Sequence, residues 1–389
     1  FWEATSVLSY LLISHRSASK TSRGAALQAL LVTTLGGLAM LVGLVLLSAE
    51  VGSTSLGVII EAAPRGPLAT TAVMLVLVGA LSKSAIVPFH FWLPAAMAAP
   101  TPVSAYLHAA AMVKAGIFLI GRMAPGFADM PGWRETLIVL GILTMLLGGW
   151  QSLRQHDLKL VLAHGTVSQL GLLVVVIGFG TQETALAGLA MLTAHALAKA
   201  ALFLVVGIVD HRTGTRDLRK LSGLGRQAPI TAIAAALAIA SMIGLPPTFG
   251  FVAKEAAFGA FVDAGESGMV WGWVALVGIA VGSMLTVAYG IRFWWGAFAR
   301  KRGVTPVADV AEHPDMLASP SILALTGVGL GLAAPLVDTW VAPYAATLPP
   351  VLDHPTHLAL WHGFTLPLGI SVAVLALGAA FAALVIRSP

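Results

Sequence analysis

Ten apolar segments, each about as long as a membrane-spanning helix, most constrain how this chain of 389 residues can fold. A helix needs roughly 20 apolar residues to cross the hydrocarbon core of a bilayer, which is about 30 Å thick. The segments that meet this requirement lie at about 25–48, 68–93, 103–124, 133–153, 158–180, 184–209, 228–262, 269–298, 318–341 and 362–386. The sequence therefore predicts an all-α, polytopic membrane protein.

A further apolar segment, at about 1–14, opens the chain. As a helix, its residues before Ser14 would rise only about 20 Å, which is too short to span a bilayer. Because the chain also begins at Phe1 and not at a methionine, we expect it to be a fragment whose first span starts upstream. Together with the ten complete segments, this partial one brings the prediction to about eleven transmembrane segments in a lipid bilayer.

Charged residues are too scarce for a soluble protein. Asp, Glu, Lys and Arg make up 10% of this chain, against roughly 25% of a typical soluble domain. A net charge of +5 spread over so few charges does not indicate a nucleic-acid-binding surface. The chain has no cysteine, which excludes disulfides, iron–sulfur clusters and a thiol nucleophile. Nucleotide-binding and HExxH motifs are also absent, so we expect no cofactor.

Lysine and arginine are unevenly distributed between the connections. Fifteen, Lys159 among them, lie in or beside connections that follow odd-numbered segments, and three lie in even-numbered ones. The positive-inside rule places the basic connections in the cytoplasm. Because one miscounted segment would scramble this distribution, it supports eleven segments. We expect a multi-pass protein of the bacterial cytoplasmic membrane.

Six acidic or lysine side chains fall inside apolar segments, where a charge costs a few kcal/mol. They are Glu3, Lys83, Lys114, Lys199, Lys254 and Glu255. Snorkelling to the interface or a structural ion pair would explain one such lysine as well as a functional role does. Four lysines in four helices instead favour a functional site that faces a cavity or a partner.

Two of these lysines accompany a helix break, because proline removes a backbone donor. The breaks are expected at Pro88, which follows Lys83, and at Pro246, Pro247 and Gly250, which precede Lys254. The two segments are five positions apart, so the second enters the membrane from the opposite side. This pattern predicts inverted repeats that each hold one discontinuous helix, although two ordinary proline kinks are the simpler alternative.

The inverted-repeat interpretation divides the chain into three parts. Residues 1–130 form a first repeat that is truncated at its N-terminus, and residues 131–302 form the second repeat. Residues 303–389 supply additional C-terminal transmembrane helices.

Two intramembrane histidines lie near the remaining lysines. His195 and Lys199 are four residues apart and share a helix face. His108 and Lys114 lie on one expected helix, but six residues place them on different faces. Histidine titrates near neutral pH, so such groups can pass protons through water. A lone histidine is more often a packing residue, but two with lysines predict a proton relay, for which Glu3 supplies an acid.

A connection near the C-terminus holds three more histidines, His354, His357 and His362, with Asp353 as the nearby acid. Spacing of this kind can bind a metal. We expect an interfacial loop whose histidines are incidental, and we assign no metal site.

The residues around the first break also resemble a known family. Residues 82–120, SKSAIVPFHFWLPAAMAAPTPVSAYLHAAAMVKAGIFLI, are similar to the signature of proton-conducting membrane subunits. That family includes the antiporter-like subunits of respiratory complex I and the large subunits of Mrp-type cation/proton antiporters. Other matching stretches are FWEATSVLSYLLI, DLKLVLAHGTVSQLGLL, HALAKAALFLVVG and GLPPTFGFVAKE. The resemblance covers nearly the whole chain.

The resemblance implies a role for each matching residue, as members of a chain of protonatable groups across the membrane midplane. The implied relay consists of Glu3, Lys83, His108, His195, Lys199 and Lys254, with Lys114 at a position that varies among relatives. Ala256 and Ala257 stand where relatives of this family often have bulkier residues.

Two further stretches, IVDHRTGTRDLRKLSGLG and LALWHGFTLPLGIS, resemble the A-type subunits of Mrp antiporters. The resemblance implies part of a secondary transporter, not an enzyme, that works with other subunits to exchange Na⁺ (or K⁺) for H⁺. The same relay also fits the antiporter-like subunit of a redox pump, of the NADH-quinone oxidoreductase chain L type, or of a bicarbonate uptake complex. Neighbouring genes would discriminate between these alternatives.

Overall fold

A computed structural model describes residues 1–16, 18–306, 314–352 and 356–387. Within these ranges the chain is built of helices and their connections, and its one isolated β-bridge joins Asp157 to Asp217. The predicted all-α fold is therefore confirmed over the described residues.

The helices fall into long spans and short pieces. In chain order they are α1 Trp2–Ile13, α2 Lys20–Val51, α3 Leu56–Ala62, α4 Pro67–Lys83, η1 Phe89–Phe91, α5 Trp92–Ala95, η2 Ala96–Ala98, α6 Thr101–Ala105, η3 Tyr106–Ala110, α7 Lys114–Phe127, α8 Trp133–Arg154, α9 Leu158–Gly178, α10 Gln182–Thr213, α11 Leu224–Gln227, α12 Pro229–Ile243, α13 Phe249–Glu266, α14 Val270–Phe298, α15 Pro314–Leu332, α16 Ala334–Ala345 and α17 Leu366–Arg387.

Eight helical stretches of the described chain are long and apolar enough to cross a membrane. They are α2, the stretch from α6 to α7, α8, α9, α10, α14, α15 and α17. The apolar helices α4 and α12 are shorter, because each stops at a break. With α1 these helices account for the eleven predicted segments.

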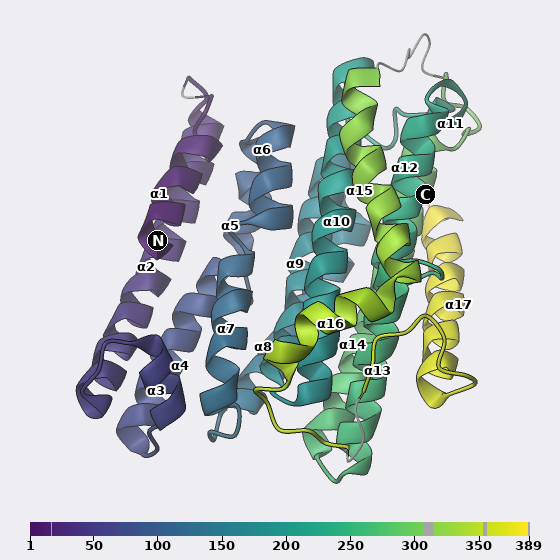
Figure 1. Cartoon of the computed structure of the whole chain (residues 1–389). Helices are drawn as coiled ribbons and strands as arrows, with labels where there is room; N and C mark the ends of the chain where they lie inside the picture. The colour runs from purple at the N-terminus through teal and green to yellow at the C-terminus, as the bar shows by residue number, and fades with distance from the viewer. Residues whose placement is uncertain (17, 307–313, 353–355, 388–389) are drawn as a thin grey trace.

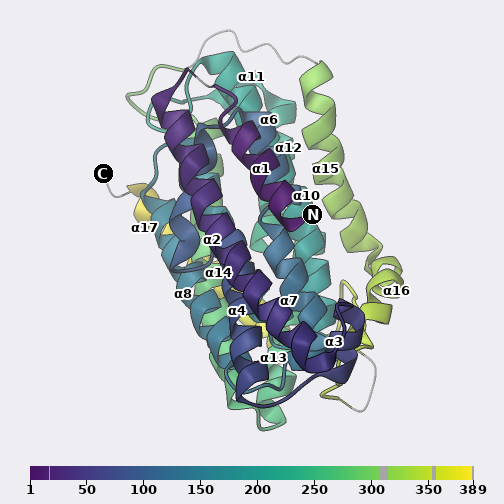
Figure 2. The same ribbon diagram turned by 90° about the vertical axis from the view of Figure 1, so that its left-hand side faces the viewer.

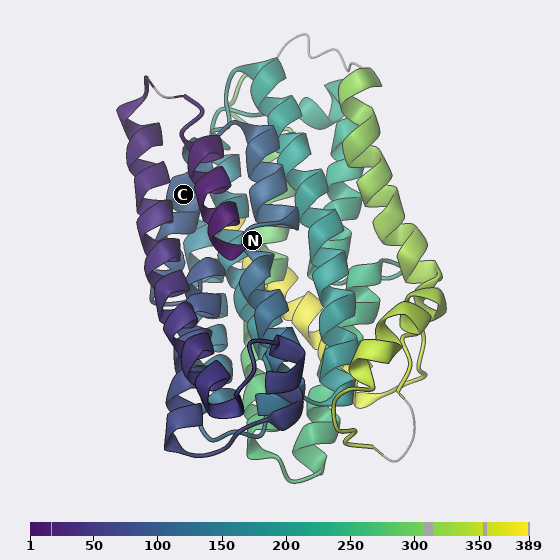
Figure 3. The same ribbon diagram turned by 60° about the vertical axis from the view of Figure 1, so that its left-hand side comes forward.

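The spans stand side by side, with their connections gathered at two ends of the molecule (Figure 1). The end with connections 214–223 and 299–306 carries most of the arginines, and we call it the basic end. The other, called the acidic end, holds connections 52–66, 128–132 and 267–269 and the described parts of 346–365. The N-terminus lies halfway between the ends, and α1 runs from there to the basic end (Figure 3).

The two broken segments run in opposite directions. Helix α4 starts at the acidic end and stops in the middle of the molecule at Lys83, before the unwound residues 84–88 (Figure 1). Helix α12 starts at the basic end and stops at Ile243, and α13 resumes at Phe249 towards the acidic end. Each break contains one cis proline peptide, Val87–Pro88 and Pro246–Pro247.

Two segments that the sequence predicted as single helices are interrupted. The segment at 318–341 is two helices, because Pro335 at the start of α16 cannot continue the hydrogen bonding of α15; α16 then lies across the spans (Figure 1). The segment at 103–124 passes through the π-helical turn η3 and then breaks before α7. The prediction that His108 and Lys114 share one continuous helix is therefore wrong.

Helix α9 lies at the centre of the molecule. It is apolar all round, as expected of a helix enclosed by others, and most of its residues are buried. Helices α1, α2 and α4 form one flank, and α17 packs against α14 on the other (Figures 1 and 2). The protonatable residues considered next lie between α9 and its neighbours or at the two breaks.

Candidate functional site

The first break positions Lys83 against α1. Lys83 is the last residue of α4 and is fully buried. Its Nζ donates to Ser6 Oγ at 2.7 Å and to the carbonyl of Trp2 at 3.2 Å, and it lies 5.3 Å from the centre of the Trp2 ring. The exposed Glu3 carboxylate, one residue further on α1, acts on this ammonium through its charge. The structure therefore brings Lys83 and Glu3 together, with Ser6 as the direct partner.

Glu3 itself lies against α2. Its Oε2 accepts a hydrogen bond from Thr34 Oγ1 at 3.5 Å. A side-chain carbon at Gly37 would come within 2.2 Å of Glu3 Oε1. The absence of a side chain at Gly37 thus makes room for the carboxylate.

A short hydrogen-bonded link joins the first break to Lys114. Ser84, which follows Lys83, donates to the carbonyl of Val113 at 2.8 Å. Lys114 is the next residue, and its Nζ donates to the carbonyl of Leu192 on α10 at 3.1 Å. Lys114 therefore connects the Lys83 region to the helix that carries His195 and Lys199.

Helix α10 presents His195 and Lys199 to the interior. Lys199 Nζ donates to the carbonyl of Leu162 on α9 at 3.2 Å and lies 5.8 Å from the centre of the Tyr289 ring. His195 is buried, and neither of its ring nitrogens has a hydrogen-bond partner within the described chain. The charges of Lys114 and Lys199 both act on His195. A neutral imidazole has one nitrogen that accepts a proton and one that donates it, so a His195 ring without partners in the described chain is suited to exchange protons.

His108 lies in the π-helical turn η3, with its ring 5.8 Å from that of Phe203 on α10. It is buried, and both ring nitrogens lack a partner in the part of the chain that the structure describes. π-helical turns recur at functional sites. The charges of Lys159 and Lys199 act on this imidazole, so His108 also belongs with the α10 group.

Lys159 is a buried amine, although the sequence predicts a loop charge that orients the chain. Only 1% of Lys159 is exposed. Its Nζ donates to the carbonyl of Met97 at 3.0 Å and to that of Ala99, where the first broken segment ends. At the first turn of a helix, an inward lysine and a snorkelling lysine follow the same sequence pattern, so periodicity could not distinguish them.

The second break holds Lys254. Its Nζ donates to the carbonyls of Met242 and Ile243, at 3.3 and 3.0 Å, which are the last residues of α12. A helix C-terminus carries a partial negative charge, so it favours an ammonium there. Gly250, which the sequence grouped with the break, lies in the first turn of α13, where a side-chain carbon would come within 1.7 Å of the Ser241 carbonyl oxygen.

The buried amines share one property. Lys83, Lys114, Lys159, Lys199 and Lys254 all donate to backbone carbonyls, and Lys83 also to a hydroxyl. Over the described residues, none of them is ion-paired to a carboxylate. Neutral partners of this kind leave a lysine free to gain and lose its proton without breaking an ion pair.

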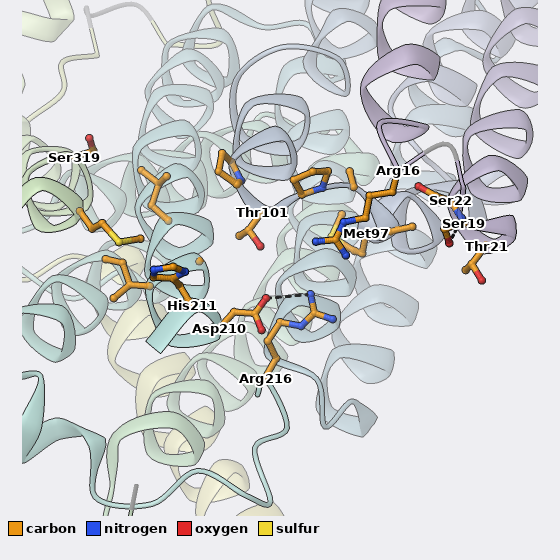
Figure 4. A pocket seen from close by; sticks show the side chains of 18 of the residues that line it. Arg16, Ser19, Thr21, Ser22, Met97, Thr101, Asp210, His211, Arg216 and Ser319 are labelled. Carbon is orange, nitrogen blue, oxygen red and sulfur yellow. Dashed lines mark hydrogen bonds and ion pairs between the residues drawn. The ribbon is translucent and has the colours of Figure 1, made fainter. Parts of the chain in front are cut away.

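A cavity of about 1020 Å³ opens at the basic end, between the α1–α2 connection and helix α10 (Figure 4). Arg16, Asp210, His211 and Arg216 line it, and Arg216 forms ion pairs with Asp210 at 3.7 Å and with Asp157 at 3.2 Å. Met97 and Ala99, whose carbonyls accept hydrogen bonds from Lys159, also line this cavity. Lys159 therefore lies directly behind the cavity wall.

Three titratable groups outside the spans show how the basic end is held together. A hydrogen bond from Arg219 lowers the pKa of Asp217 to about 2. Burial lowers the pKa of Lys301 to about 8, and its Nζ donates to the carbonyls of Leu218 and Gly296. Burial also lowers the pKa of His156, which lies beside Arg292. These groups fix the connections at the basic end and lie apart from the predicted relay residues.

The histidines near the C-terminus do not gather around a metal site in the described chain. His354 and Asp353 lie outside the described residues. His357 Nδ1 contacts Asp338 Oδ2 at 3.2 Å, and His362 Nε2 contacts the His357 carbonyl at 3.1 Å. Within the described ranges, no three His, Cys, Asp or Glu residues converge as metal ligands would.

Comparison with known proteins finds one family model, described as the NADH:quinone oxidoreductase/Mrp antiporter transmembrane family, which matches residues 1–286. A probable A/B-type K(+)/H(+) antiporter subunit of Rhizobium meliloti is 40% identical over 97% of this chain and 38% of its own length. The A-type Na(+)/H(+) antiporter subunit of Alkalihalophilus pseudofirmus is 39% identical over 97% of this chain and 51% of its own length. The chain thus spans about half the length of such curated relatives, or less.

Solved structures show the same fold. A chain of the Mrp complex from Dietzia sp. DQ12-45-1b superimposes with a TM-score of 0.89 and 38% identity, over 98% of this chain and 42% of that one. A chain of the membrane-bound sulfane sulfur reductase, an archaeal respiratory membrane complex, superimposes with a TM-score of 0.79 at 22% identity, over 90% and 71% of the two chains. At that lower identity the likeness shows the fold alone.

Proposed function

Because this chain belongs to the NADH:quinone oxidoreductase/Mrp antiporter transmembrane family, we propose that it is the proton-translocating core of an A-type subunit within an antiporter complex. The complex would exchange Na⁺ or K⁺ for H⁺ across the bacterial cytoplasmic membrane, with further subunits as partners. The chain would serve as part of a transporter, with no catalytic site of its own. The antiporter names of its relatives support this assignment, and both ions occur in those names.

The observation that carries the proposal is the set of buried amines and imidazoles between the two breaks. A charged lysine inside a membrane protein is costly and is retained where it has a function. Here the amines donate to carbonyls and, for Lys83, to a hydroxyl, and the two imidazoles have no hydrogen-bond partner within the described residues. Neutral hydrogen-bond partners suit groups that must change protonation state during each cycle.

We propose an order for the relay from the contacts between its members. Glu3 and Lys83 form the entry group, and Ser84 and Val113 link them to Lys114. His195, Lys199 and His108 form the central group around α10. Lys254 forms the exit group at the second break. Protons would pass between groups through water, and each arrival of charge would favour release at the next amine by electrostatic repulsion.

We propose the same division into repeats that the sequence predicted. Residues 1–130 and 131–302 would be inverted repeats, and residues 303–389 would be added helices. The opposite directions of α4 and α12, each ending at a break beside a buried lysine, support this division.

The test is cation-driven proton exchange in everted membrane vesicles that contain the complete complex. Addition of NaCl or KCl to respiring vesicles is expected to release protons from the lumen, which a pH-sensitive dye reports. A response to one cation and not the other would identify the transported ion. A complex that shows proton movement coupled only to a redox substrate, and none with either cation, would refute the antiporter assignment.

A further inference from the structure

Lys199 lies where helices α9, α10 and α14 meet. It is carried by α10 and is fully buried. Its Nζ donates to the carbonyl of Leu162 on α9 at 3.2 Å, and Thr166 Oγ1 donates to the same carbonyl at 2.8 Å. An ammonium has three N–H donors. Within the described residues, this shared carbonyl accepts from only one of them, so the charge needs stabilisation from another source.

The ring of Tyr289 on α14 supplies a second partner for this amine. Lys199 Nζ lies over the ring, 5.8 Å from its centre. The face of an aromatic ring is negative, and a cation within about 6 Å of the ring centre is attracted to it. Tyr289 is also fully buried, so bulk water does not screen the attraction. The ring therefore stabilises the ammonium form of Lys199 and has no comparable effect on the neutral amine.

Contacts with α9 fix the ring in this position. Tyr289 Oη donates to the carbonyl of Gly165 at 3.3 Å and accepts from Gln169 Nε2 at 3.4 Å. Gln169 Nε2 also donates to Thr286 Oγ1 on α14 at 3.0 Å. A side-chain carbon at Gly165 would lie 3.0 Å from a carbon of the Tyr289 ring and 3.1 Å from Lys199 Nζ. The glycine thus lets the ring and the amine approach the same point of α9.

The same pairing of a buried lysine with an aromatic ring recurs at the first break. Lys83 Nζ lies over the ring of Trp2, 5.3 Å from its centre. In both pairs the ring comes from a different helix than the lysine, α1 for Trp2 and α14 for Tyr289. Two amines of the proposed relay therefore have an aromatic face in addition to their hydrogen-bond partners.

We infer that Tyr289 is a positioning residue of the relay, whose ring favours the ammonium form of Lys199 and whose hydroxyl fixes that ring through Gly165 and Gln169. This inference rests on the proposed antiport function and adds a residue that carries no proton itself. When a proton arrives, an N–H bond forms on the Lys199 amine and the ring stabilises the new charge. When the proton leaves, that stabilisation is lost. The ring thus acts on the proton-loaded state alone.

The test changes the charge distribution of the ring and leaves its shape nearly unaltered. Tyr289→Phe keeps the ring, and fluorine atoms on a phenylalanine withdraw electron density from its face with little change in size. Phenylalanines with one, two and three ring fluorines are inserted at position 289 by nonsense-codon suppression. Cation-driven proton exchange is then measured in everted vesicles that contain the complete complex.

The exchange rate is expected to fall in step with the number of fluorines. We expect a loss of about threefold per fluorine and about 30-fold for three, which corresponds to the roughly 2 kcal/mol of a desolvated cation–π contact. Tyr289→Leu, which removes the ring, is expected to lose about as much as the three-fluorine ring. Tyr289→Phe without fluorine loses only the contacts of the hydroxyl, so its rate is expected to stay within a few-fold of the unaltered one.

Phe293 provides the matched control. It is a buried ring one turn further along α14, and no cation lies over it in the described chain. The same fluorinated residues at position 293 are expected to leave exchange unaltered, because they change only the size and hydrophobicity of a ring. Assembly of each variant is checked by size-exclusion chromatography. If Tyr289→Phe does not assemble, the series is repeated with ring-fluorinated tyrosines, which keep the hydroxyl.

Two results would overturn the inference. One is exchange that does not fall with fluorination at position 289, and the other is an equal fall at positions 289 and 293. An unaltered complex that shows no cation-driven proton exchange would instead refute the proposed function, so the two failures are distinguishable.

Discussion

The two breaks hold their lysines by different means. Lys83 reaches out of its own segment to α1, where a hydroxyl, a carbonyl and the nearby Glu3 surround it. Lys254 turns back onto its own segment and donates to the last two carbonyls of α12. The first lysine therefore depends on a neighbouring helix, and the second on the end of the helix that precedes it.

This difference indicates how each lysine can be controlled. A movement of α1 alters the partners of Lys83 directly, and a change of charge on Glu3 alters the field at its ammonium. Lys254 keeps its carbonyl partners as long as α12 keeps its C-terminus, so its partners lie within its own broken segment. We therefore infer that, in the proposed relay, the first break is the adjustable end and the second is the fixed end.

The largest loss of exchange is expected from removing either lysine, and the two breaks are expected to respond equally. Lys83→Ala and Lys254→Ala each remove a proton carrier, and each is expected to reduce cation-driven exchange about 100-fold or more. Vesicle assays on separately assembled variants measure this. If one variant kept the unaltered rate, its lysine would not belong to the relay, and the two breaks would not act in series.

Ser6→Ala is expected to affect the first break and not the second. It deletes the 2.7 Å hydroxyl partner of Lys83 and leaves Lys254 untouched. A hydrogen bond to a charged group contributes about 1.5–3 kcal/mol, so loss of this partner is expected to slow exchange roughly tenfold. Ser9→Ala, a buried serine on the same helix, is the control. Equal rates for the two variants would show that Ser6 does not serve Lys83.

Gly37→Ala tests the role of Glu3 without altering a titratable residue. The added carbon would come within 2.2 Å of Glu3 Oε1 and push the carboxylate away from α2. We expect a loss of a few-fold, since a charge effect across the first break is weakened and not removed. Adding Glu3→Asp, whose shorter side chain leaves room for the carbon, is expected to recover part of the rate.

The control for this pair is Gly24→Ala on the same helix, where an added side-chain carbon meets nothing within 4 Å. Its rate is expected to match the unaltered protein. A similar loss in both glycine variants would assign the effect to α2 itself and not to the position of Glu3.

The smallest effect is expected at the basic end, away from both breaks. In the folded protein Arg219 lowers the pKa of Asp217 to about 2, below the ordinary value of about 3.9. The stabilisation from this exposed pair is therefore present above pH about 4 and lost as the pH falls towards 2. Asp217→Asn is expected to lower the melting temperature slightly at pH 7 and to leave exchange unchanged. A large loss of exchange would show that this end is coupled to the relay.

The sequence predicted the breaks and their lysines because proline and intramembrane charge are local signals. Pro88, Pro246 and Pro247 lie in the two breaks, and Lys83 and Lys254 lie beside them. Their partners could not be predicted, because carbonyls such as those of Met242 and Leu162 are present in every residue. Only the folded chain selects which carbonyl meets which amine.

The misplaced features have a common cause, since each depends on packing between segments. Lys159 follows the pattern of a loop charge and yet turns inward to Met97 and Ala99. The turn around His108 adopts π-helical hydrogen bonding, which its alanine-rich sequence does not predict. The sequence predicts one continuous helix through Pro335, but the structure ends α15 before this proline and begins α16 around it.

The central claim is that Lys83 and Lys254 carry the protons of a cation/proton exchange. It is tested most directly by replacing both with alanine in the complete complex and measuring exchange in everted vesicles with NaCl and with KCl. We predict that neither cation moves protons, although the complex assembles and remains in the membrane. Exchange at the unaltered rate in this double variant would contradict the account.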